Sequence, residues 1–177
     1  MNRKLRDILI LLCLCFTLTS CTAAPKGSVI SENQPVESLS AEKLSAHQAD
    51  AYYAVFLDLF QQDPALNAGK YLAIDFSQAM LADTAPLILH IQAFCDEQGY
   101  TLLQDTFSGL EEKGYIADNA FTDGFLISFE DQRLDEEQLV TLARKWRTGL
   151  GAFGAEYKAD WKNGQWVLAD LEMIEQS

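Results

Sequence analysis

Three carboxylates at the ends of two predicted strands are the residues best suited to acid–base chemistry. Asp75 lies near the end of the first predicted strand, and Glu130 and Asp131 end the second. If these strands are neighbours, the carboxylates could lie together, as a glycosidase requires of its acid and its base or nucleophile. The alternative is that they are solvated strand ends, because acidic residues are frequent in this chain. They are candidates for catalysis with no reaction assigned.

A second group of candidates is basic. Arg144, Lys145 and Arg147 cluster in an otherwise acidic sequence, and a glycine-rich stretch follows them. Such a cluster could bind an anion or dock a partner, because guanidinium groups hold carboxylate or phosphate with two parallel hydrogen bonds. The structural alternative is that these cations end a predicted helix and complement its dipole.

Residues 149–154 match the pattern G-x-G-x-x-G letter by letter. In a dinucleotide site this pattern follows a strand and opens a helix, so that phosphate meets the helix N-terminus. Here a predicted helix precedes the glycines and a predicted strand follows them. The order therefore favours a helix end and a tight turn into a strand over nucleotide binding.

We expect neither a metal nor a cofactor. Residues 118–124 superficially resemble a calcium loop, but Ala120 stands where a ligand should be. His47 and His90 belong to no zinc-ligand pattern. Cys95 falls at an apolar position of a predicted helix and is expected to be a small buried hydrophobe, with a nucleophile as the alternative.

The elements that must position these residues are four helices and four strands. Hydrophobic periodicity, caps and turn signals predict helices over about 49–62, 84–98, 106–113 and 135–147, and strands over about 70–76, 125–130, 156–162 and 165–173. Asn163-Gly164 predicts a type I′ turn that pairs Lys162 with Gln165 and Trp161 with Trp166. We therefore predict an α+β fold, with an antiparallel sheet of about four strands, helices packed on one face and a C-terminal β-hairpin.

The N-terminus carries the pattern of an export signal. Arg3, Lys4 and Arg6 precede an apolar segment that is too short to span a bilayer. The run Leu18-Thr19-Ser20-Cys21 ends that segment and resembles the lipobox of bacterial lipoproteins. The resemblance implies that residues 1–20 are removed and that Cys21 carries a lipid. An ordinary cleaved signal and an uncleaved anchor are the alternatives.

The mature chain that this processing would leave is strongly acidic. Loss of residues 1–20 removes three basic residues and Asp7, so the formal charge moves from -13 to -15. Such a chain is repelled by nucleic acid and by anionic lipid headgroups, which excludes a nucleic-acid partner. The lipid itself must then hold the protein at the extracytoplasmic face of the cell membrane.

The rest of the sequence divides into a tether and one domain. Residues 21–48 have the composition of a segment that cannot bury enough surface to fold, and residues 49–177 are long enough for a single domain. Residues 145–166 are similar to parts of uncharacterised bacterial lipoproteins, which implies no activity. We expect a non-enzymatic binding or interaction module at the cell envelope. The alternative is a small envelope hydrolase that uses carboxylates on glycan or peptide.

Overall fold

The computed structural model describes residues 39–169 and 172–176, which belong to one folded unit. The predicted signal sequence and Cys21 lie outside the described residues. The elements, in chain order, are helix α1 (Ala41–Gln61), the short 3-10 helix η2 (Pro64–Asn67), β1 (Tyr71–Gln78), α2 (Ala85–Gln98), β2 (Thr101–Gln104), α3 (Phe107–Glu112), β3 (Ile116–Ala117), β4 (Ala120–Phe121), β5 (Gly124–Leu134), β6 (Gln138–Thr148), β7 (Gly151–Lys162), β8 (Gln165–Leu168) and β9 (Glu172–Gln176).

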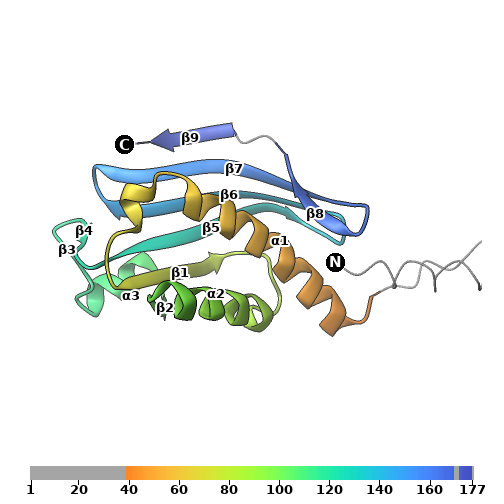
Figure 1. Cartoon of the computed structure of the whole chain (residues 1–177), viewed down its shortest axis with the longest axis horizontal. Coiled ribbons are helices and arrows are strands. Elements are labelled where there is room, and N and C mark those ends of the chain that lie inside the picture. Colours follow the sequence, from red (N-terminus) through yellow and green to blue (C-terminus); the bar gives the residue numbers. More distant parts are fainter. Residues whose placement is uncertain (1–38, 170–171, 177) are drawn as a thin grey trace, which may run out of the picture. The chain divides into compact units, whose positions relative to one another are not determined.

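The strands form one mixed sheet (Figure 1). Strand β1 lies between β2 and β5 and is parallel to both. From β5 onward the pairing is antiparallel, through β6 to β7. Strands β8 and β9 both pair with β7, and the short β3–β4 hairpin is joined to the end of β6. The sheet therefore combines a parallel part around β1 with an antiparallel meander.

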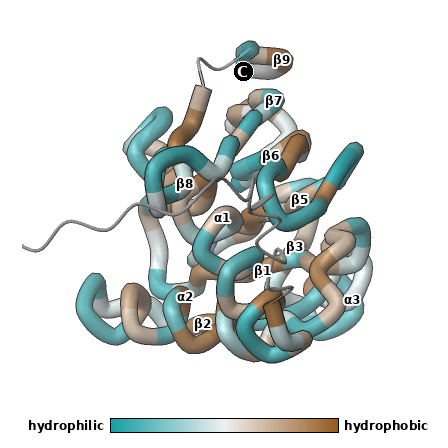
Figure 2. Tube along the Cα trace, turned by 90° about the vertical axis from the view of Figure 1, so that its right-hand side faces the viewer, coloured by the Kyte–Doolittle hydropathy of each residue, from teal (hydrophilic) through white to brown (hydrophobic). Residues whose placement is uncertain are grey.

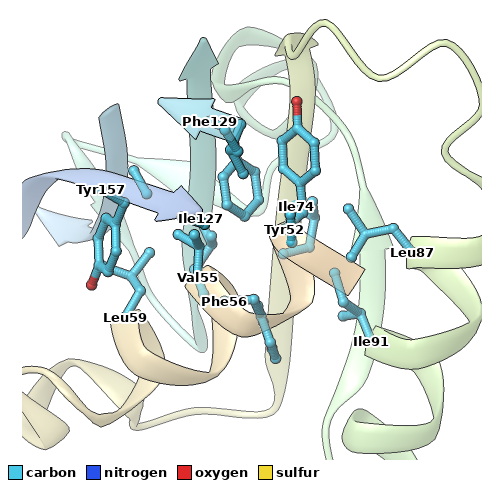
Figure 3. Packing of buried hydrophobic residues seen from close by; sticks show 14 of the residues in the cluster. Tyr52, Val55, Phe56, Leu59, Ile74, Leu87, Ile91, Ile127, Phe129 and Tyr157 are labelled. Atoms are coloured by element: carbon cyan, nitrogen blue, oxygen red, sulfur yellow. The ribbon is translucent and has the colours of Figure 1, made fainter. Parts of the chain in front are cut away.

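Helices cover both faces of this sheet. Figure 2 shows α1 and α2 on one side and α3 on the other. We call these the α1 face and the α3 face. The main core fills the α1 face, where Tyr52, Val55, Phe56 and Leu59 recur at helical spacing and are fully buried. Figure 3 shows these α1 side chains together with Ile127, Phe129 and Tyr157 of the sheet and Leu87 and Ile91 of α2.

A smaller core lies on the α3 face. It joins α3 and the β3–β4 hairpin to one end of the sheet through five buried residues, Ala73, Leu110, Ile116, Phe121 and Leu126. Because neighbouring strand residues point to opposite faces, β1 and β5 supply apolar side chains to both cores. This explains why the first predicted strand is apolar on both sides.

The predicted sheet is wrong in its strand number and its pairing. The described residues form nine strands in place of about four, and β1 pairs in parallel with both of its neighbours. Helices also do not keep to one face, since α3 packs on the side opposite α1. The β1–α2–β2 unit is a parallel crossover, which the antiparallel expectation did not include.

The largest error is the predicted helix over residues 135–147. These residues form the β5–β6 turn and most of β6. The apolar positions chosen for a helical stripe divide between the two faces of the strand: Leu139 and Ala143 belong to the main core, whereas Leu142 and Trp146 alternate with them. Sheet partners on both sides of β6 outweigh the local charge pattern that favoured a helix.

The predicted hairpin turn is confirmed in its register. Strands β7 and β8 pair Lys162 with Gln165 and Trp161 with Trp166. Asn163 and Gly164 both have positive φ, at 54° and 80°, as a type I′ turn requires. The hairpin is not the last element, however, because β9 follows and pairs with another part of β7.

Helix α1 begins at Ala41, before the start near Ala49 that periodicity indicated. Its N-cap Ser40 accepts a hydrogen bond from the Lys43 amide. It ends at Gln61, before Asp63-Pro64, as expected. Within the described part of the chain, no helix combines the length and apolar character that crossing a membrane requires.

Candidate functional site

The carboxyl ends of β1 and β5 occupy a distinctive position in the topology. From β1 the chain passes through α2 on the α1 face to β2, and from β2 through α3 on the α3 face to β5, on the opposite side of β1. Such a reversal is a topological switch point. In open α/β sheets, ligands bind outside the carboxyl ends of the strands at this point. We therefore place the candidate site there.

Asp131 is the centre of this site. Its Oδ2 atom accepts hydrogen bonds from the Tyr52 hydroxyl of α1 and from the Met80 amide, at 2.6 Å, in the segment after β1. One carboxylate thus joins α1, β5 and the β1–α2 segment. Its other oxygen, Oδ1, is buried and has no hydrogen-bond partner in the described structure.

Thr141 lies directly across from Asp131 on β6. Thr141 is fully buried, and its Oγ1 is the second buried side-chain oxygen without a partner among the described residues. Two such atoms at paired positions are unusual, because most buried polar atoms are hydrogen-bonded.

Tyr52 is held in its protonated form. Burial raises the pKa of its hydroxyl, and the hydrogen bond to Asp131 and the carboxylate charge raise it further. The phenol therefore remains a hydrogen-bond donor over the physiological pH range. Sequence analysis treated Tyr52 only as part of an apolar helix stripe.

The other two acidic candidates lie on the opposite side of the sheet. Asp75 alternates with the core residues of β1 and accepts a hydrogen bond from the Ser77 amide at 2.8 Å. Glu130 precedes Asp131 and forms an exposed ion pair with Arg144 at 3.0 Å. The neighbouring strands do bring Asp75 and Glu130 to one face, but the sheet separates both from Asp131.

The three basic candidates are also divided by the sheet. Arg144 lies on the α3 face with Glu130, and Lys145 points to the α1 face and is fully buried. Arg147 is half-buried near the end of β6. The structure therefore does not present these residues as a single basic surface.

Lys145 instead closes the end of α1. The three N–H groups of its ammonium are shared among four oxygens, the carbonyls of Phe60 (3.1 Å), Gln62 and Asp63 (3.1 Å) and Oδ1 of Asn67 (2.7 Å). Helix ends leave carbonyls without intrahelical partners, and this lysine supplies donors for them. Burial lowers the pKa of Lys145 to about 8, against the opposing effect of the Asp63 charge.

Two further side-chain contacts fix α1 to the sheet. The Tyr157 hydroxyl of β7 donates to Oδ2 of Asp58 at 3.0 Å. Trp166 of β8 donates to the His47 carbonyl at 2.8 Å, and the His47 ring packs against Trp161 and Trp166. Together with the Tyr52–Asp131 hydrogen bond and the Lys145 contacts, these interactions attach α1 to the sheet along most of its length.

The glycine pattern has a structural role. Gly149 and Leu150 form the β6–β7 turn, and β7 begins at Gly151. A Cβ atom at position 149 would lie 2.4 Å from Nδ2 of Asn119, so a larger residue there would displace the Asn119 side chain. The predicted turn into a strand is confirmed, since β7 follows it, but the predicted helix end is wrong, because strand β6 precedes the glycines.

The metal and cysteine expectations concern residues away from this site. Among the described residues, no group of three or more His, Cys, Asp and Glu side chains is arranged to hold a metal ion. Cys95 is buried in α2, and burial raises the pKa of its thiol to about 11. His90 stacks on Tyr53 and lies 3.4 Å from Asp50.

Comparisons with protein-family models, with curated proteins and with solved structures find no match to this chain. The similarity of residues 145–166 to bacterial lipoproteins stays a prediction.

Proposed function

We propose that this chain is a lipid-anchored extracytoplasmic binding module, and that its ligand or partner contacts the carboxyl ends of β1 and β5. The observation that carries the binding site is the topological switch point, where Asp131 joins α1, β5 and the segment after β1. The lipobox ending at Cys21 supports the location.

The arrangement suits recognition more than catalysis. Asp131 already accepts hydrogen bonds from the Tyr52 hydroxyl and the Met80 amide. These contacts fix the surface of the site in one geometry, which lowers the entropy lost on binding. Met80, beside Asp131, exposes 55% of its surface and offers an apolar contact to a partner.

The anchor is tested by Cys21→Ala. We expect the variant to remain unprocessed or to leave the membrane fraction, because the lipid would be attached to the sulfur of Cys21 and alanine has no such atom. Fractionation and the mass of the N-terminal peptide measure both effects. Cys95→Ala is the matched control and should be processed and retained like the wild type. Unchanged processing and retention of the Cys21 variant would contradict the anchor.

The binding site is tested by photocrosslinking in intact cells. Met80→benzoylphenylalanine places a reactive group at the proposed site, and Leu150→benzoylphenylalanine places one in the β6–β7 turn. Leu150 is 88% exposed and lies beyond the end of the sheet opposite to Asp131, since β6 runs antiparallel to β5. We expect one discrete adduct from position 80 and none of the same mass from position 150. Identical adducts, or adducts from position 150 alone, would contradict the site.

A further inference from the structure

Two unpartnered oxygens inside the domain lie on adjacent strands. Oδ1 of Asp131 and Oγ1 of Thr141 are both buried, and the two residues are directly paired between β5 and β6. Both occupy the α1 face: Asp131 contacts Tyr52 of α1, and Thr141 lies two residues from each of the core residues Leu139 and Ala143 and so shares their side of the strand. The side chains therefore project to the same side from neighbouring positions.

Neither atom has a hydrogen-bond partner among the described groups around it. The two donors that reach Asp131, from Tyr52 and Met80, both go to Oδ2. The side chain across from Thr141 on the other side, Tyr157, donates its hydroxyl to Asp58. A carboxylate oxygen only accepts hydrogen bonds, whereas a threonine hydroxyl donates and accepts. A molecule that bonds both must therefore donate to Asp131.

We infer that Asp131 and Thr141 together hold one small hydrogen-bond donor on the α1 face of the β5–β6 pair. The donor is water itself or an ammonium ion. Buried waters in proteins typically bridge otherwise unsatisfied polar groups in this way. The site complements the charge of Asp131 and links β6 to the contacts that Asp131 makes with α1 and Met80. It exists whether or not a partner binds outside the domain.

The first test is Thr141→Val, which removes the hydroxyl and keeps the side-chain shape. If the hydroxyl binds the bridging molecule, the variant loses a buried hydrogen bond, and we expect its melting temperature to fall by about 3 to 5 °C. Thr101→Val, at an exposed position of β2, is the matched control and should change it little. A Thr141→Val variant at least as stable as the wild type would overturn the inference. That result is expected if the hydroxyl has no partner, because a buried unpaired hydroxyl is less stable than a methyl group in the same place.

The second test does not depend on stability. Nuclear Overhauser effects from water to the amides of Asp131 and Thr141, measured in sodium chloride, would support bound water. A protein-bound resonance from ¹⁵N-ammonium chloride at the same ionic strength, absent in Thr141→Val, would support ammonium in the same site. The absence of both signals would overturn the inference.

Discussion

Replacing Lys145 by methionine is expected to lower the free energy of unfolding by about 3 kcal/mol. Methionine retains the apolar stem but removes the ammonium group, so four oxygens at the end of α1 lose their common donor. Two of those bonds are to carbonyls outside the regular helix, at Gln62 and Asp63, where Asp63 has a left-handed backbone with φ 40°. The effect is large because four partly buried acceptors lose the same donor at once.

Urea unfolding near neutral pH measures this change. Lys158→Met is the matched control, since Lys158 lies on the neighbouring strand β7 with an exposed side chain. Its surface ion pair is expected to contribute less than about 1 kcal/mol. Equal losses in the two variants would contradict the role assigned to Lys145.

The wild type and Lys145→Met should also differ in how their free energy of unfolding depends on pH. The pKa of Lys145 is about 8 in the folded protein and 10.5 as the ordinary value, so between these pH values the unfolded chain binds more protons. The contribution of Lys145 to stability therefore rises with pH across this range, at up to about 1.4 kcal/mol per pH unit. Subtracting the curve of Lys145→Met removes the effects of Tyr52, Tyr157 and Cys95, which titrate in both proteins. A difference that shrinks with pH would contradict the lowered pKa.

The second large effect is expected for Tyr52→Phe, a loss of about 2 kcal/mol in the free energy of unfolding. The variant keeps the buried ring against Phe129 and removes the hydrogen bond to Asp131. Of the two protein donors to Asp131, only the Met80 amide then remains. Hydrogen bonds to charged groups contribute more than neutral ones, and a buried carboxylate that loses a donor is costly.

Tyr53→Phe is the control for this variant. Tyr53 is the next residue of α1, and its hydroxyl forms no hydrogen bond within the described structure, so its removal should change stability little. Because the pKa of Tyr52 is raised above its ordinary value of 10, its contribution is present below that pH and is lost as pH rises above it. The free energies of unfolding of Tyr52→Phe and Tyr53→Phe should therefore approach each other in strongly alkaline solution. A cost in Tyr53→Phe as large as that in Tyr52→Phe would contradict this account.

Local signals predicted the elements whose ends are set by one or two residues. Gly99 ends α2 with a left-handed φ of 83°, and Thr106 caps α3 through the Gly109 amide. Asn163-Gly164 set both the turn and its register. These features are decided within a few residues of chain, so the sequence alone contains the necessary information.

Sheet partners could not be found in the same way. The stretch from Leu139 to Trp146 satisfies both a helical and a strand period, and the choice is made by β5 and β7 on either side. The parallel pairing of β1 with β5 joins segments about fifty residues apart, and no local signal specifies it. Asp131 was therefore named as a candidate without Tyr52 and Thr141, which only the three-dimensional arrangement brings to it.

The attachments along α1 have a mechanical consequence. If Cys21 is fixed in the membrane, any pull on the tether reaches the folded unit at Ser40, the cap of α1. The contacts of His47, Tyr52 and Asp58 follow one another along the helix, with the Lys145 contacts at its far end. A force applied at Ser40 would act on these contacts one after another along the helix. The Lys145 contacts would come last, and they involve the largest number of hydrogen-bond acceptors. Helix α1 would therefore be the element through which a membrane anchor transmits force to the domain.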